Sequence, residues 1–177
     1  MAHRPTELLA AVEEAYATVR EVVGHLTDEQ ARGDSLLPGW SRGHVLTHLA
    51  RSADGDRRCV EAAARGEVVA KYPEGMEGRE RDIEAGSSRP PAELVADLDA
   101  TQRALVDAWG ALPDDGWDRV GDTPSGRRSI SEIARSRRRE LVVHLVDLDL
   151  GVTPSALPAD YLEDDRDWLA EYRPAWA

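Results

Sequence analysis

The sequence lacks the features of a secreted or membrane-embedded protein. It has a single cysteine, Cys59, so an internal disulfide is excluded. No apolar run approaches the roughly 18 residues that a membrane-spanning helix needs, and no apolar segment typical of a signal peptide follows the polar residues 1–7. These absences predict a cytoplasmic protein that does not cross a membrane.

Positive charge is also scarce. The net charge is −12, and a strongly acidic protein is repelled by nucleic acids and anionic membrane surfaces, so neither is expected as a partner. Arginine is concentrated at Arg135, Arg137, Arg138 and Arg139. Such a cluster is typical of a helix face that pairs with acidic residues. Only Arg137 falls on the apolar stripe of its segment, so only Arg137 invites a functional interpretation.

Phenylalanine is absent, and no segment shows the alternating pattern of a strand. Apolar residues recur instead at spacings of three and four, which predicts amphipathic helices. These stripes predict helices over residues 6–26, 41–65, 91–109 and 129–150, the second of them ended by Gly66 in a left-handed conformation. Four long helices without an internal repeat predict an all-α four-helix bundle.

The connections between these helices are unusually long for a compact domain, and connections of this length often carry function. The first covers residues 67–90 and contains a predicted short helix, 79–85, which Gly86 should end. The second covers residues 112–126. The tail, residues 156–177, contains two tryptophans and predicts a short fifth helix packed on the bundle. This tail also suggests a homodimer interface.

Polar residues interrupt the apolar stripe of the last long helix. Glu140 and His144 are four residues apart, so both lie on the face that should be buried. Burying one polar group without a partner costs roughly 2–7 kcal/mol, and a divalent metal would compensate both residues. His48, on the stripe of the second helix, offers a third ligand. Two histidines and a carboxylate suit zinc with one open position, and also Fe(II), nickel or manganese.

Other interpretations of these residues stay open. A buried Glu140 paired with Arg137, beside a hydrogen-bonded core histidine, explains the pattern without a metal. His44 and His48 are also four residues apart, but Val45 follows His44, so the glutamate of the His-Glu-x-x-His motif is absent. His44 lies in the first turn of its helix, where it either contacts a substrate or a metal ligand or is simply exposed.

Stretches at residues 36–54, 81–86, 94–98 and 139–148 together carry a recognisable pattern. They resemble the mycothiol-dependent maleylpyruvate isomerase family, a branch of the DinB-like bundles, over about residues 6–160. The resemblance implies a DinB-like four-helix bundle in which zinc is bound by His48, Glu140 and His144.

The resemblance also implies a chemistry. The metal binds a low-molecular-weight thiol, mycothiol in actinobacteria, and lowers the thiol pKa so that the thiolate is present near neutrality. Addition to the cis double bond of maleylpyruvate gives a single bond that rotates, and elimination returns fumarylpyruvate. The protein's own Cys59, expected to be a small buried thiol, is not needed. Arg137, Arg81 and His44 are the candidates to contact the thiol or the substrate carboxylates.

Two further functions fit the same centre. A mycothiol S-transferase would conjugate the thiol to a small-molecule electrophile, in detoxification or secondary metabolism, in place of isomerising an alkene. A non-catalytic metal-binding bundle would use the tail for dimerisation. Two-domain members of the family carry a further C-terminal domain, whereas this sequence ends at Ala177. We therefore expect one domain, residues 1–177, with its core at about 6–155 and no second domain.

Overall fold

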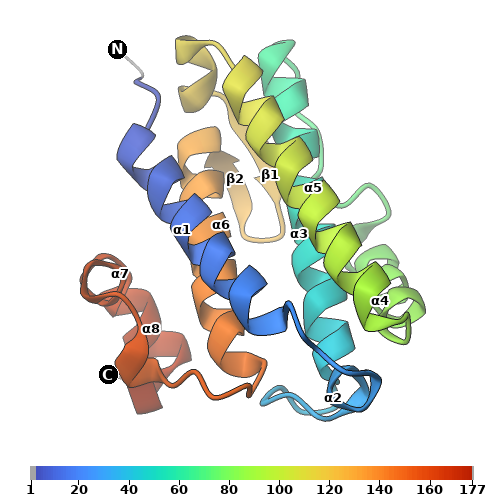
Figure 1. The fold of residues 1–177 in the computed structure, drawn as a ribbon. Coiled ribbons are helices and arrows are strands. Elements are labelled where there is room, and N and C mark those ends of the chain that lie inside the picture. The colour runs from blue at the N-terminus through green and yellow to red at the C-terminus, as the bar shows by residue number, and fades with distance from the viewer. Residues whose placement is uncertain (1–2, 177) are drawn as a thin grey trace.

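The computed structural model describes residues 3–176, which form a bundle of four long helices (Figure 1). These helices are α1 (Thr6–Val23), α3 (Arg42–Ala64), α5 (Pro91–Ala111) and α6 (Ile130–Asp147). α3 packs against α5 and α6, and α1 packs against α6, so their apolar stripes share one core. The predicted all-α bundle is confirmed. Within residues 3–176, no helix is both long and apolar enough to cross a membrane.

The helix ends follow local signals in the sequence. Ser41 and Ser129 cap α3 and α6, each with a hydrogen bond to the backbone three residues on. α3 ends before Gly66, whose φ of 75° is the predicted left-handed conformation. α1 ends three residues earlier than predicted because Gly24, a poor helix former, begins the turn into the short helix α2 (Asp28–Arg32).

The connection between α3 and α5 contains a longer helix than predicted. α4 spans Gly75–Ser87, and Gly86 lies inside it rather than ending it. A Cβ atom on Gly86 would lie 2.6 Å from Cγ2 of Thr47 on α3, which is too close for any larger residue. This glycine therefore allows α4 to pack closely on α3 beside His48.

The prediction that the chain has no strands is wrong for the second connection. A 3-10 turn, Asp114–Asp118, leads into an antiparallel hairpin of β1 (Val120–Thr123) and β2 (Gly126–Ser129). Of the eight strand residues only Gly121 is buried. The apolar alternation that marks a half-buried strand is therefore missing from the sequence, which explains the error.

The tail contains two short α-helices where one was predicted, α7 (Ala159–Asp164) and α8 (Arg166–Tyr172). They pack on α6 through an apolar cluster that includes Val142, Val146 and Tyr161. Figure 1 shows them beside α6 on the opposite side from α5. Arg135, Arg138 and Arg139 of α6 form ion pairs with aspartates of the tail, so the predicted pairing of the arginine cluster with acidic residues is confirmed for these three.

Candidate metal centre

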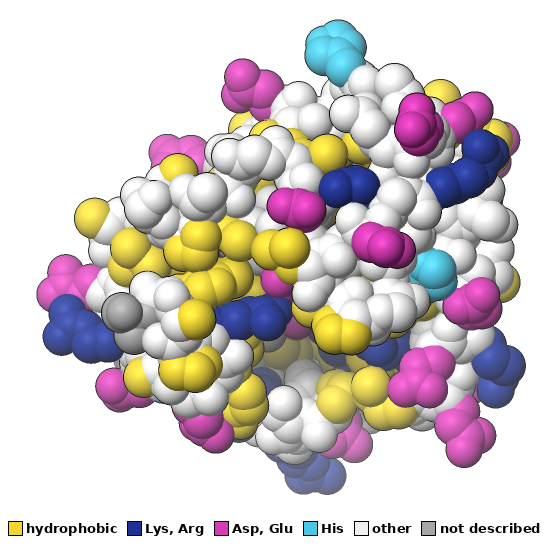
Figure 2. All heavy atoms as spheres, turned by 90° about the horizontal axis from the view of Figure 1, so that it is seen from below, with side chains coloured by type: hydrophobic (Ala, Val, Ile, Leu, Met, Phe, Trp, Pro, Cys, Tyr) yellow, Lys and Arg dark blue, Asp and Glu magenta, His cyan; other side chains and the backbone are white. Residues whose placement is uncertain are grey.

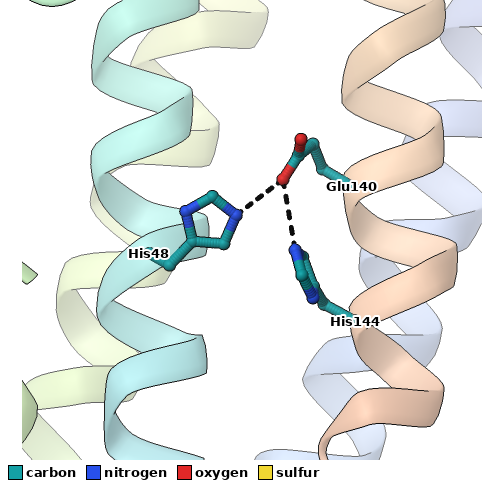
Figure 3. Close-up of side chains that lie close together, drawn as sticks. All are labelled: His48, Glu140 and His144. Carbon is teal, nitrogen blue, oxygen red and sulfur yellow. Dashed lines mark hydrogen bonds and ion pairs between the residues drawn. The ribbon is translucent and has the colours of Figure 1, made fainter. Parts of the chain in front are cut away.

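The three predicted metal ligands lie together between α3 and α6, and their side chains point toward one another (Figure 3). One possible ligand atom from each of His48, Glu140 and His144 lies within 4.8 Å of the other two. Nε2 of His48 is 2.6 Å from Oε2 of Glu140, and Nε2 of His144 is 3.3 Å from the same oxygen. Two helices far apart in sequence thus place three donor groups around one point.

This donor set fits a divalent metal ion. Zinc binds histidine nitrogen and carboxylate oxygen at about 2.0–2.2 Å, so neighbouring ligand atoms of a tetrahedral centre lie about 3.3–3.6 Å apart. The separation of 3.3 Å between Glu140 and His144 matches this spacing, whereas the 2.6 Å between Glu140 and His48 is a hydrogen bond that would have to lengthen to admit an ion. Three protein ligands leave one tetrahedral position for water or a substrate. Other divalent metals suit the same ligands, so the donor set does not select zinc alone.

The two histidines differ in charge. Burial lowers the pKa of His48 to about 4, so this ring is neutral at neutral pH. Burial acts in the same direction on His144, but hydrogen bonds to Asp147 and Glu140 outweigh it and raise its pKa to about 9. Burial favours the neutral form of Glu140, but the two histidines outweigh it and hold its pKa well below the usual value. In this structure a protonated His144 therefore balances the negative charge of Glu140, as a bound metal ion would.

A second carboxylate orients His144. Oδ2 of Asp147 lies 2.9 Å from Nδ1 of His144, and Arg173 of the tail donates to the same oxygen at 2.7 Å. Metal-binding histidines usually donate their second N–H to such a carboxylate, which fixes the ring and leaves Nε2 for the metal. Neither Asp147 nor Arg173 was predicted from the sequence. The signal for Asp147 was its place three residues after His144, whereas the sequence carries no signal for Arg173.

We expect Asp147→Asn to weaken metal binding by about 10–100-fold, the usual cost of losing an outer-shell partner. The amide keeps the size of the side chain but removes the charge that holds Nδ1–H of His144. Calorimetric titration with Zn²⁺ measures the change. Asp115→Asn, which alters an exposed ion pair with Arg119, is the matched control. Equal affinities for the two variants would show that Asp147 does not support the centre.

Arg79 of α4 contacts the cluster from another side. Its Nη2 donates to Nδ1 of His48 at 2.8 Å. Because Nδ1 accepts this hydrogen bond, the proton of the neutral ring lies on Nε2 and points to Glu140. The Arg79 guanidinium also lies 5.9 Å from the ring centres of Trp40 and Tyr72. Arg79 was not predicted from the sequence, because a single arginine in a polar helix carries no periodic signal.

The metal centre opens into a cleft of about 590 Å³ between α3, α4, α6, α8 and the hairpin. His48 and Glu140 form part of its wall. Figure 2, which views the molecule from below, shows a hollow near the centre of that face with Lys and Arg side chains at its edge. The cleft-lining cations are Lys71, Arg79, Arg128, Arg135 and Arg139, and its aromatic residues are Tyr72, Trp168 and Tyr172.

Arg137, predicted to contact the thiol or substrate, lies instead in the core and outside the cleft lining. Its side chain is fully buried. The guanidinium donates to the carbonyl oxygen of Leu49 at 2.8 Å and to Oε1 of Gln102 at 2.8 and 3.1 Å. Arg137 thus joins α6 to α3 and α5. The prediction that Arg137 points toward the interior of the bundle was correct. Its side chain, however, lies at the interface of α6 with α3 and α5 and does not line the cleft.

The other two predicted contacts also lie outside the cleft lining. Arg81 is on α4, with 62% of its side chain exposed, and pairs with Glu74. Nδ1 of His44 lies 2.7 Å from Oγ of Ser41, and its Nε2 lies 3.1 Å from Glu84. His44 therefore takes part in the capping of α3. In this structure the cleft-lining cations, rather than these residues, face the space beside the metal centre.

Comparisons with known proteins agree with this arrangement. Residues 2–149 match the family of the mycothiol maleylpyruvate isomerase N-terminal domain. Crystal structures of the mycothiol-dependent maleylpyruvate isomerase, and of its variant with one histidine replaced by alanine, are similar to this chain with TM-scores of 0.85 and 0.84 and 26% identity. No curated protein matches the chain.

Each structural match covers 89% of this chain and 66% of the solved one, so the chain spans slightly less than two thirds of the isomerase. The family match covers all four long helices and every residue of the candidate metal centre. The chain therefore has a DinB-like bundle and belongs to the family of the mycothiol maleylpyruvate isomerase N-terminal domain.

Proposed function

We propose that this protein is a metal- and mycothiol-dependent isomerase of the maleylpyruvate type, with zinc as its metal. The observation that carries the proposal is the cluster of His48, Glu140 and His144, which would hold the ion at the wall of an arginine-lined cleft. Similarity to the mycothiol-dependent maleylpyruvate isomerase supports it. When bound, the metal would supply a Lewis acid that lowers the pKa of a thiol to near neutrality.

The cleft offers cations for the carboxylates of the substrate. Arg139 is already engaged, because Asp165 accepts two hydrogen bonds from it at 2.8 and 2.6 Å. Arg128 and Arg135 have only loose ion pairs, both at 3.9 Å, and about half of each side chain is exposed. These two guanidinium groups can therefore turn to bind a carboxylate with two parallel hydrogen bonds.

Arg79 would be released toward the substrate when the metal site is filled. A neutral histidine that binds a metal through Nε2 carries its proton on Nδ1. Arg79, which donates to Nδ1 of His48 in this structure, would then face another donor and could not keep that hydrogen bond. Its guanidinium would turn toward the cleft, which it already lines. Binding of a metal by His48 would in this way make the Arg79 guanidinium available to an anionic substrate.

The isomerisation itself needs only addition and loss of the thiol. The thiolate forms a C–S bond with one carbon of the cis double bond, and the electron pair moves into the adjacent carbonyl group. The remaining single bond rotates while arginines hold the carboxylates. Expulsion of the thiolate restores the double bond in the trans geometry, so the thiol is regenerated and no oxidant or reductant is consumed.

Cys59 is not the nucleophile in this proposal. It is buried, and burial raises its pKa to about 11. At about pH 8 the thiolate population should be more than about 100-fold smaller than that of free cysteine. We expect iodoacetamide to modify folded Cys59 more slowly by at least that factor, as followed by mass spectrometry. Cys59→Ala should retain full activity, and rapid alkylation of the native protein would contradict this assignment.

The test of the function follows the fate of the thiol. Zinc-loaded protein is incubated with mycothiol and maleylpyruvate, and fumarylpyruvate and free thiol are measured by chromatography and mass spectrometry. Isomerisation gives product at constant thiol, whereas an S-transferase would consume one thiol for each product. Absence of turnover by the zinc-loaded protein would contradict both.

Arg79→Ala should raise the KM for maleylpyruvate, because it removes a cation from the wall of the cleft. Arg65→Ala, which alters an exposed ion pair with Glu67, is the control.

A further inference from the structure

A second polar group lies in the same cleft, away from the metal centre. Asp56 of α3 and Lys71, which follows α3, both line the cleft. Oδ1 of Asp56 lies 2.8 Å from Nζ of Lys71. Both residues are buried, with exposed fractions of 1% and 8%. Lys71 is the only lysine in a chain that otherwise uses arginine, so a compact ammonium group occupies this place alone.

Three features of the fold hold Lys71 in place. Its backbone N–H donates to the carbonyl of Asp122 at 2.8 Å, and Asp122 donates to Val69 at 3.1 Å, which attaches this segment to β1. Gly55 makes room for the side chain, because a Cβ atom there would lie 2.7 Å from Cγ of Lys71. Nζ also donates to Oγ of Ser52 at 3.2 Å. A glycine inside a helix lowers the stability of the helix. At Gly55 this cost accompanies the space that the Lys71 side chain needs.

The pair has unused hydrogen-bonding capacity. An ammonium group has three N–H donors, and Nζ of Lys71 donates one hydrogen bond, to Ser52, while it forms an ion pair with Oδ1 of Asp56. Both carboxylate oxygens of Asp56 are buried, and neither accepts a hydrogen bond of normal geometry from residues 3–176, although Oδ1 forms the ion pair with Lys71. Buried carboxylate oxygens are almost always hydrogen-bonded, because leaving them unpaired is costly. A donor and an acceptor thus stand side by side in the cleft wall.

Stability alone does not account for the pair. Removing two charges from water often costs more than their mutual attraction returns, and apolar residues of similar volume are often as stable or more so. A buried ion pair with an unpaired oxygen is less favourable still. Its place in the wall of the cleft, rather than in the closed core, indicates that a ligand completes it.

The helix that carries Asp56 also fixes its distance from the metal centre. His48, Ser52 and Asp56 follow one another at intervals of four residues, so they lie along one face of α3. At a rise of about 1.5 Å per residue, Asp56 lies about 12 Å along the helix axis from His48. A ligand that reaches both groups must be extended over this length.

We propose that Asp56 and Lys71 form a second subsite, which binds a hydroxyl or carboxamide group of the thiol whose sulfur lies at the metal centre. This inference deepens the proposed function and rests on it. Asp56 would repel a carboxylate, and Lys71 would repel an ammonium group. A neutral group with both a donor and an acceptor satisfies Oδ2 of Asp56 and the free N–H of Lys71 together. The subsite therefore selects long, polar, uncharged thiols over short ones.

The test compares two thiols on the zinc-loaded protein by calorimetric titration. Mycothiol carries amide and hydroxyl groups beyond its sulfur, whereas 2-mercaptoethanol is too short to reach from the metal centre to Asp56. The double variant Asp56→Leu with Lys71→Met replaces the pair by apolar residues and should stay folded. We expect it to bind mycothiol about 10–100-fold more weakly, because hydrogen bonds to charged groups are lost. Its zinc content and its affinity for 2-mercaptoethanol should not change.

A surface ion pair on the same helix provides the matched control. Arg57 and Glu61 lie 2.6 Å apart and outside the cleft lining, so Arg57→Met with Glu61→Leu should bind both thiols as the wild type does. Unchanged mycothiol affinity in the Asp56/Lys71 variant overturns the subsite. So does a wild type that binds mycothiol no more tightly than 2-mercaptoethanol. If neither thiol binds the zinc-loaded wild type, the proposed function fails together with the subsite.

Discussion

Glu140→Gln should abolish stoichiometric binding of a divalent metal while leaving the bundle folded. Glutamine has nearly the same size, but it replaces a carboxylate with a neutral amide that coordinates a cation poorly. Glu140 is also the residue that approaches both histidines, at 2.6 and 3.3 Å. Loss of a direct ligand should exceed the roughly 10–100-fold cost of changing an outer-shell residue. The purified variant should therefore contain no stoichiometric metal.

Elemental analysis of the purified protein measures this outcome, and far-UV circular dichroism confirms that the helices remain. Glu61→Gln is the matched control, because Glu61 pairs with Arg57 on the surface of α3 and should not affect metal content. His48→Ala and His144→Ala should behave as Glu140→Gln does. Stoichiometric metal in any of these three variants would contradict the centre and remove the basis of the proposed chemistry.

The sequence contained the information for the long helices and for the assembly of the centre. Helical spacing fixes which residues share a face, so Glu140 and His144 were expected one turn apart on the inward side of their helix. His48 was expected on the stripe of another long helix, and facing stripes of a bundle meet in one core. Capping serines at Ser41 and Ser129 set the starts of α3 and α6. These are local or periodic signals, which a single sequence carries.

The rest of the candidate site depends on contacts between segments that are distant in sequence. Arg79 reaches His48 because α4 packs closely on α3, and Arg173 reaches Asp147 because the tail folds back on α6. Neither contact leaves a periodic trace. The hairpin was missed for a related reason: its strands are polar and are held by backbone hydrogen bonds rather than by an apolar face. Most of the cleft-lining residues that were not predicted therefore lie in loops, in short helices and in the tail.

Arg137 shows where periodicity gives the direction of a side chain but not its role. Its place on the inward stripe was correctly predicted, and that stripe also carries Glu140 one turn away. The interface with α3 and α5 supplies the acceptors Leu49 and Gln102, so the charge is met by polar groups of the core. A single sequence does not show that these acceptors lie opposite Arg137, because they belong to two other helices.

Arg137→Ala should therefore lower the free energy of unfolding by about 3–5 kcal/mol. The change leaves a cavity where a fully buried side chain stood, and the acceptors on Leu49 and Gln102 lose their donor. For a chain of this length each kcal/mol shifts the midpoint of thermal unfolding by about 2–4 °C, so a decrease of about 10 °C is expected. Differential scanning calorimetry of the metal-free protein measures it without interference from metal binding.

A second substitution separates this structural role from a role in substrate binding. Arg137→Met with Gln102→Met replaces both polar partners by apolar groups, and such paired changes are far less destabilising than loss of one partner. The double variant should recover most of the stability that Arg137→Ala loses. If Arg137 instead contacted the substrate, single and double variants would both show raised KM and near-normal thermal stability. That result would place the guanidinium in the cleft and contradict its assignment to the core.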